Sequence, residues 1–116
     1  MTSREVLFLI SKTGAILYSD AGDTPLALPD SRTRWSAIWA FRDELAIVAH
    51  SHPVGPADFS AEDRSTMKAL DEALGRSLTS MVIAPAAVIA STNSVQGTVE
   101  DHAWWVALLK LASAME

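Results

Sequence analysis

The sequence predicts a single α/β (α+β) domain, residues 1–116, in which a mixed β-sheet is flanked by helices. Short apolar runs of strand length alternate along the chain with segments whose apolar residues recur at helical spacing, and this order is typical of such a sheet. The 116 residues, 49% of them hydrophobic and 20% charged, suffice for one globular core and exclude a disordered chain.

The first half of the chain is expected to form a hairpin and then a helix. Residues 6–10 and 15–18 are strand-length runs joined by turn residues 12–14, and residues 20–25 and 28–29 form a loop. Asp30 or Ser31 can cap a helix that continues to about Asp43. We expect the tryptophans of this helix to pack on the sheet, because its large side chains recur at helical spacing, namely Trp35, Ile38, Trp39 and Arg42.

The second half predicts further strands around a second helix. Residues 45–49 form an apolar run, and Pro53 should end that strand because it cannot donate to a sheet. The next helix begins at Ala61 and stops at Gly75, and its inward side chains are Met67, Leu70 and Leu74. Residues 81–83 and 88–90 complete the sheet, and residues 92–97 lie between the sheet and the tail.

The tail, residues 100–115, is predicted to be helical. His102 falls in its first turn and is treated as structural. The apolar face is broader than a surface helix requires, so a homodimer through this helix is one hypothesis; the face comprises Trp104, Trp105, Leu108, Leu109 and Leu111.

Composition and charge narrow the classes of function. Cysteine is absent, which excludes disulfides and thiolate zinc sites. No apolar run is long enough to span a membrane and no signal-peptide core follows Met1, so we expect a cytoplasmic protein. A net charge of −5 with scattered basic residues offers no electrostatic footprint for nucleic acid. Composition therefore favours neither a membrane nor nucleic acid as the partner.

Two histidines, a serine and an aspartate have the order and spacing of a metal site. His50 and His52 stand at alternate positions at the end of a strand, so both rings point from one face. After a seven-residue loop, Ser60 should cap a helix and Asp63 should lie in its first turn, facing the strand end. Two imidazoles and one carboxylate are the three protein ligands of a catalytic zinc site with an open fourth position. We expect one oxygen of Asp63 to bind metal while first-turn amides orient the other.

Each part of this pattern also has a purely structural explanation. Ser60 and Asp63 alone form a reciprocal helix cap, which is a common arrangement. Two alternate histidines in a strand often mark a solvated face. The combination is rarer than either part, and the cap and ligand roles are compatible.

The segments His50-Ser51-His52-Pro53 and Ser60-Ala61-Glu62-Asp63, at this spacing, resemble the JAMM motif of the JAB/MPN/Mov34 family of zinc metallopeptidases. The resemblance is strongest over residues 45–74 and looser over residues 5–89. The family includes deubiquitinases, prokaryotic peptidases acting on ubiquitin-like proteins, and RadC-like proteins. The resemblance implies a JAB/MPN-like (cytidine-deaminase-like) core and one zinc ion per chain on His50, His52 and Asp63. It also implies that Ser60 stabilises the oxyanion and that an upstream glutamate is the general acid and base.

Glu5 is the best candidate for that glutamate. Glu44 shares the histidine face but would lie about 20 Å away along a straight strand. Glu62 points about 100° away from Asp63 around the helix. Glu5 opens an apolar strand that can lie beside the histidines, and Arg-Glu before such a strand is similar to RadC-like members. The alternative is that Glu5 is an exposed residue at a frayed terminus.

The resemblance implies hydrolysis of a peptide or isopeptide bond at the carboxyl terminus of a ubiquitin-like or similar small protein, which would be the partner. A second hypothesis is a catalytically silent MPN-type scaffold module, because many members have a strand and a helix before the glutamate where this chain has residues 1–4. A third is a RadC-like protein of unsettled biochemistry linked to DNA.

Overall fold

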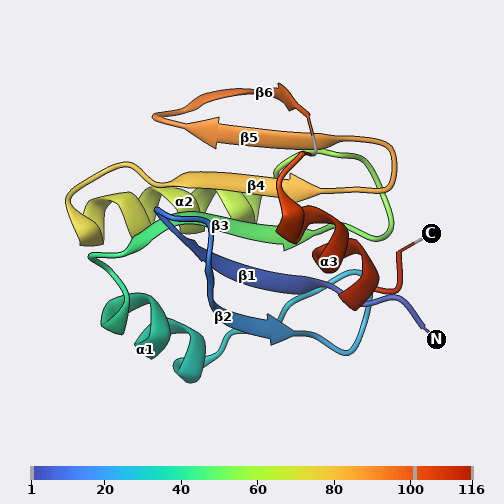
Figure 1. Cartoon of the computed structure of the whole chain (residues 1–116), viewed down its shortest axis with the longest axis horizontal. Helices are drawn as coiled ribbons and strands as arrows, with labels where there is room; N and C mark the ends of the chain where they lie inside the picture. Colours follow the sequence, from blue (N-terminus) through green and yellow to red (C-terminus); the bar gives the residue numbers. More distant parts are fainter. Residues whose placement is uncertain (1, 101, 116) are drawn as a thin grey trace.

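A computed structural model describes residues 2–100 and 102–115 of the chain. These residues form a six-stranded sheet in the order β2-β1-β3-β4-β5-β6 (Figure 1). Neighbouring strands run antiparallel except β3 and β4, which are parallel. The fold class is therefore confirmed as a small mixed α+β domain. The strands are β1 Val6–Ser11, β2 Ile16–Ala21, β3 Leu45–Ser51, β4 Thr79–Ile83, β5 Val88–Thr92 and β6 Val95–Val99.

Three helices are present in this part of the chain: α1 Arg32–Ala40, α2 Ala61–Leu74 and α3 Trp104–Ala112. In Figure 1, α3 lies in front of the sheet, α2 behind it and α1 beside β2. Helix α2 connects the parallel strands β3 and β4, so its first turn follows the loop that leaves the carboxyl end of β3. That connection brings a helix start to the strand end that carries the histidines. None of the helices among the described residues has the length and apolarity of a membrane span.

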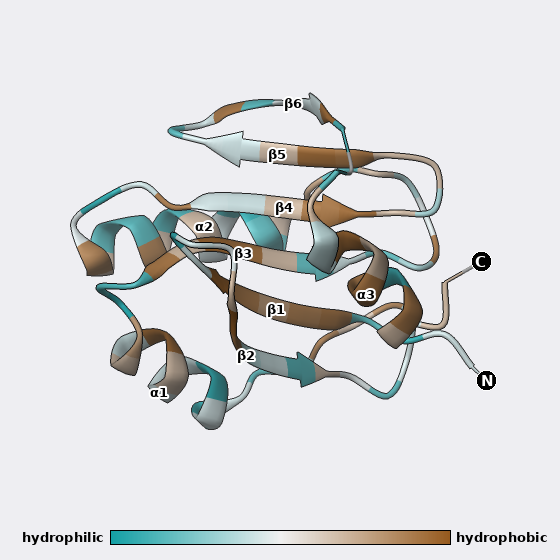
Figure 2. Cartoon of the chain, in the orientation of Figure 1, coloured by the Kyte–Doolittle hydropathy of each residue, from teal (hydrophilic) through white to brown (hydrophobic). Residues whose placement is uncertain are grey.

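Alternation along β1 and β3 divides the apolar residues between two cores. Val6, Phe8, Ile10 and Ala49 belong to a cluster that packs against buried side chains of α3. The intervening residues belong to the opposite cluster with α1 and α2, whose members include Leu7, Leu9, Val48, Ile38 and Leu70. The central strands and α3 are accordingly among the most hydrophobic elements in Figure 2. Glu5 alternates with Leu7 and His50 with Val48, so both lie on the second face of the sheet.

Several predicted boundaries are confirmed. Ser31 caps α1 and Ser60 caps α2, each by accepting a hydrogen bond from a first-turn amide. Gly75 ends α2 with φ of 69°, a left-handed conformation that glycine adopts without a Cβ penalty. The hairpin turn lies where expected, with Gly14 at φ of 86°.

The expected packing of the tryptophans of α1 on the sheet is wrong. Trp39 is 60% exposed, with its ring under the guanidinium of Arg42, and Trp35 is also exposed. The buried residues of α1 are Arg34 and Ile38. The inward face is thus rotated by one position, because the buried Arg34 pairs with Asp20. Helix α1 also ends at Ala40, before the predicted limit.

The carboxyl-terminal third differs from prediction in two places. The sheet was predicted to end with residues 88–90, but residues 92–97 contain a hairpin turn into β6, in which Asn93 and Ser94 take positive φ values of 52° and 64°. These are the conformations of a type I′ turn, whose usual signature of Asn-Gly is absent. Helix α3 is shorter than residues 100–115; within that range Asp101 lies outside the described residues. Trp104, Leu108 and Leu111 are exposed on α3, and a homodimer through this helix stays a prediction.

Candidate metal centre

The two motif histidines converge at the carboxyl end of β3. His50 is in β3, opposite Leu7 of β1, and His52 follows the strand with its amide still bonded to the Ile83 carbonyl at 2.9 Å. Alternation sends both rings to the α2 face, and their Nε2 atoms lie 3.1 Å apart. Both side chains are largely buried. The predicted sharing of one face is therefore confirmed.

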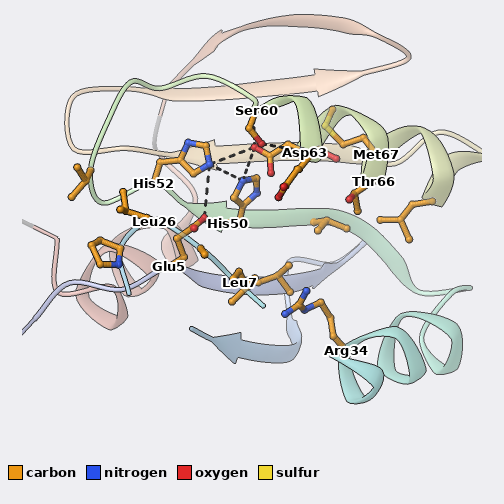
Figure 3. A pocket seen from close by; sticks show the side chains of 18 residues that line it. Glu5, Leu7, Leu26, Arg34, His50, His52, Ser60, Asp63, Thr66 and Met67 are labelled. Carbon is orange, nitrogen blue, oxygen red and sulfur yellow. Dashed lines mark hydrogen bonds and ion pairs between the residues drawn. The ribbon is translucent and has the colours of Figure 1, made fainter. Parts of the chain in front are cut away.

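Asp63 approaches both rings from the first turn of α2 (Figure 3). Its Oδ2 lies 3.3 Å from Nε2 of His50 and 3.4 Å from Nε2 of His52. The same oxygen accepts the Ser60 amide at 2.8 Å, while the Asp63 amide donates to the Ser60 hydroxyl oxygen at 3.0 Å. The carboxylate that faces the two rings is thus the same one that completes the capping box of α2. In this structure Oδ2 both faces the rings and accepts the Ser60 amide, so the division of the two oxygens between metal and helix start stays a prediction.

The spacing of these three atoms fits a single small cation. Two Nε2 atoms and Oδ2 form a triangle with edges of 3.1, 3.3 and 3.4 Å. Ligands about 2.0–2.1 Å from a tetrahedral zinc are separated by about 3.3 Å, so the triangle matches one face of such a site. Imidazole and carboxylate are also ligand types that zinc accepts. The donor set and its spacing therefore fit a zinc ion.

Glu5 lies beside this triangle and is only 7% exposed, so it is not the exposed residue of the alternative explanation. Its Oε1 is 3.9 Å from Nε2 of His52, and Glu5, His50 and His52 each place one ligand atom within 4.8 Å of the others. These three residues could also hold a metal ion. Asp63 is nevertheless the better third ligand, because its oxygen is within 3.4 Å of both rings.

The backbone around Glu5 is tied at every neighbouring position. The Glu5 amide donates to the Thr24 carbonyl and the Gly22 amide donates to the Glu5 carbonyl, at 3.0 and 2.9 Å. The preceding Arg4 amide bonds the Ser113 carbonyl at the end of α3. This segment is therefore held by the loop after β2 and by the end of α3, and it is not a frayed end.

Ser51 is a site residue that the sequence did not reveal. It lies between the histidines but points to the opposite face, fully buried. Its hydroxyl accepts the Val6 amide at 2.9 Å and lies 2.7 Å from the Ser113 hydroxyl. Ser51 thus joins the histidine strand to the residue after Glu5 and to the end of α3. A buried hydroxyl in an apolar strand was the available indication.

Electrostatics of the metal-free cluster follow from these contacts. Burial raises the pKa of Asp63, but hydrogen bonds from His50 and His52 outweigh it and hold that pKa well below its usual 3.8. The hydrogen bond to Asp63 raises the pKa of His52 above 6.5 despite burial. Burial raises the pKa of Glu5 above 4.5, against the opposing influence of the histidines. Asp63 is therefore anionic and lies between the two rings, and a negative charge there would favour a bound cation.

The cluster opens into a cavity of about 320 Å³. Glu5, Ser60 and Asp63 line it on one side, and Arg34 of α1 lies on another (Figure 3). The remaining wall is mainly aliphatic and includes part of the loop before α1. Its lining residues are Leu7, Pro25, Leu26, Leu28, Val48, Met67 and Leu70. The size is at the lower end of small-ligand pockets, about 300–1,000 Å³.

The remaining polar candidates lie away from the cluster. His102 precedes α3, is highly exposed and pairs with Glu100 at 3.3 Å, so it is outside the site. Glu44 is exposed at the opposite end of β3. Glu62 lines the cavity mouth but is exposed, beside Asp63. Neither acid approaches the histidines as Glu5 does.

Comparison with known families agrees with this geometry. The Prok-JAB family, prokaryotic homologs of the JAB domain, matches residues 9–107. The match includes His50, His52, Ser60 and Asp63, while Glu5 lies just before it. No curated protein gives a significant match. Because the family match covers most of the chain and the strand order brings its histidines and aspartate together, the protein belongs to the prokaryotic JAB-domain family.

Proposed function

We propose that this protein is a zinc-dependent metallopeptidase that hydrolyses a peptide or isopeptide bond at the carboxyl terminus of a ubiquitin-like or similar small protein. The observation that carries the proposal is the triangle of His50 Nε2, His52 Nε2 and Asp63 Oδ2, with edges of 3.1 to 3.4 Å beside the buried carboxylate of Glu5. JAB-family membership supports the reaction class.

In this proposal, His50, His52 and Asp63 hold one zinc ion per chain. Bound zinc would acidify a water molecule and polarise the scissile carbonyl. Glu5 takes a proton from the attacking water and passes it to the leaving amine, a role favoured by the raised pKa of its buried carboxyl. The Ser60 oxygen accepts the Asp63 amide, so its hydroxyl proton is free to donate to the developing oxyanion.

The decisive experiment compares Glu5→Gln with Glu44→Gln, an exposed glutamate at the other end of β3. Glutamine keeps the shape of Glu5 but cannot accept the proton, so we expect the rate to fall about 10²–10⁴-fold while zinc stays bound. Glu44→Gln should leave both unchanged. Hydrolysis of ubiquitin-like isopeptide conjugates and zinc content by elemental analysis are measured on each protein.

Two results would contradict the proposal in different ways. Full activity of Glu5→Gln would assign the base to another residue. A zinc-loaded wild type that cleaves no peptide or isopeptide conjugate would favour a metal-binding scaffold module over an enzyme.

A further inference from the structure

Arg34 is a buried cation on the cavity wall that the proposed chemistry does not use. It belongs to α1, and its side chain is only 8% exposed. A charge this far from water needs partners, and Asp20 of β2 supplies one at 2.9 Å. The cavity therefore has the metal cluster on one side and a guanidinium on another (Figure 3).

One nitrogen of Arg34 has N–H groups that no described residue accepts. Nε donates to Oδ2 of Asp20, and Nη2 forms an ion pair with the same oxygen and donates to the Pro29 carbonyl. Nη1 makes no hydrogen bond within the described part of the chain. No buried side-chain nitrogen or oxygen among these residues is both sealed from water and unpartnered, so Nη1 is accessible. Since Arg34 lines the cavity, this nitrogen offers two N–H donors to a molecule bound there.

Strand register gives the spacing between Asp20, which pairs with the guanidinium, and His50 of the metal cluster. Leu7 of β1 pairs with Asp20 on one side and with His50 on the other. The three residues form one row across the sheet, and two strand spacings amount to about 10 Å. An extended peptide covers that distance with roughly three residues.

The wall between the two ends suits an extended chain rather than an anion. Leu7, Val48 and Met67 line the cavity there and offer apolar contacts. Asp20 already neutralises Arg34, and Glu62 lies with Arg34 in the adjoining hollow, so a free carboxylate would meet negative charge. A neutral acceptor such as a peptide carbonyl avoids that repulsion.

We propose that Arg34 is a specificity-determining residue whose Nη1 donates to a main-chain carbonyl about three residues from the scissile bond, on the acyl side of an extended peptide substrate. The inference rests on the proposed function, in which the acyl side is the tail of the small protein. It makes the site selective for a tail long enough to reach α1.

The test uses N-acetylated peptides of one to five residues that end in glycine and are joined to the ε-amine of lysine amide. With wild-type, zinc-loaded protein, kcat/KM should rise when the peptide reaches about three residues, by about 10- to 100-fold for a hydrogen bond from a charged donor. Arg34→Lys can keep the charge near Asp20 but lacks the second terminal nitrogen. It should abolish the rise and leave cleavage of the shortest peptide unchanged.

Arg64→Lys is the matched control, because Arg64 is a half-exposed arginine of α2 outside the cavity lining. It should keep the full dependence on length. If Arg34→Lys does not fold, the wild type still tests the proposal. An alkene that replaces the amide whose carbonyl lies about three residues from the scissile bond should remove the same 10- to 100-fold gain. A gain that survives this replacement overturns the assignment, as does an equal loss at all lengths in Arg34→Lys.

Two further arms keep the alternatives apart. Succinylated short peptides that outperform acetylated ones in wild type but not in Arg34→Lys would show an anion subsite and overturn the carbonyl assignment. If zinc-loaded wild type cleaves nothing, the proposed function fails. The role of Arg34 in binding is then tested by calorimetry with the five-residue peptide. Binding about 10-fold or more weaker in Arg34→Lys would support the subsite, and equal binding would refute it.

Discussion

The two faces of the sheet use the same strands for opposite purposes. On the α3 face, β1, β3 and β4 contribute a continuous apolar cluster closed by Trp105, Val106 and Leu109. On the α1/α2 face, the neighbouring residues of β1 and β3 line a cavity of about 320 Å³ that ends in a cluster of charges. A shift of one residue along β3 separates Ala49, in the closed core, from His50, in the open site.

This difference indicates where the stability of the domain arises. The α3 face buries apolar side chains against one another, which contributes favourable free energy of folding. The site face gives up packing for a cavity, and it buries the charged side chains of Glu5 and Arg34 on different sides of that cavity, with Asp63 partly buried. Buried ionic groups rarely stabilise a protein more than apolar residues would. We therefore expect substitutions on the two faces to separate stability from metal binding.

The largest expected effect is loss of the metal from the site face. The double variant His50→Ala, His52→Ala lacks two of the three proposed ligands, so its zinc content should fall from one ion per chain to none. The matched control is His102→Ala, at an exposed histidine that pairs with Glu100 away from the site. Elemental analysis after gel filtration measures both. Stoichiometric zinc in the double variant would place the ion elsewhere.

The next effect should fall on stability alone. Leu109 is fully buried in the α3 cluster, so Leu109→Ala should lower the free energy of unfolding by about 2–5 kcal/mol. Zinc content of the folded protein should not change. Leu111→Ala is the control, because Leu111 is 71% exposed on the same helix and should cost little. Urea titration gives the stabilities, and zinc loss in Leu109→Ala would show that the faces are not separable.

The pH dependence of the site face should reverse when metal binds. The pKa of His52 is raised above 6.5 by Asp63, so in the metal-free chain this pair stabilises fully below pH 6.5. That stabilisation is lost as pH rises through the raised pKa, with a slope of at most about 1.4 kcal/mol per pH unit for one proton. Zinc must displace the proton, so zinc-dependent stabilisation should instead grow with pH.

Melting curves between pH 6 and 8, with and without zinc, measure both trends. The metal-free trend should be weaker in Asp63→Asn, because the Asp63 hydrogen bond is the main cause of the raised pKa. Parallel trends with and without zinc would contradict the proposed competition between proton and metal.

The strands and helices with strong local patterns could be predicted from the sequence. The apolar run of β3, the Ser60 cap and the Gly75 stop each follow from short-range chemistry. The orientation of α1 could not, because it depends on the ion pair between Arg34 and Asp20, 14 residues apart in the chain. Strand β6 was missed because its residues are all exposed and the Asn93-Ser94 turn lacks glycine.

The candidate site was more predictable than the fold because its spacing is local. His50 and His52 share a face by strand alternation alone, and Asp63 returns to them because Ser60 begins α2. Glu5 needed the pairing of β1 with β3, which a family resemblance supplied and the sequence pattern did not. The contacts of Ser51 and Arg34 could not be predicted, since they join residues far apart in the chain, Ser113 and Asp20.

The smallest expected effect separates the two roles of Asp63. In Asp63→Asn, the amide oxygen can still accept the Ser60 amide, whereas the negative charge towards the histidines is lost. Asp63→Ala loses both. Both variants should therefore bind zinc more weakly, but metal-free Asp63→Ala should be less stable than metal-free Asp63→Asn by about 1 kcal/mol, the contribution of one hydrogen bond.

Ser31→Ala provides the comparison that a helix cap alone would give. Ser31 caps α1 and accepts the Arg34 amide at 3.2 Å, away from the histidines, so its loss should cost about 0.5–2 kcal/mol and leave zinc affinity unchanged. Calorimetry gives the stabilities and a competing chelator gives the affinities. If the two Asp63 variants were equally stable and bound zinc like the wild type, Oδ2 would serve neither the helix start nor the metal. The Asp63 variants therefore test whether the oxygen that accepts the Ser60 amide at the start of α2 also holds the metal beside β3, so that the helix and the site depend on one residue.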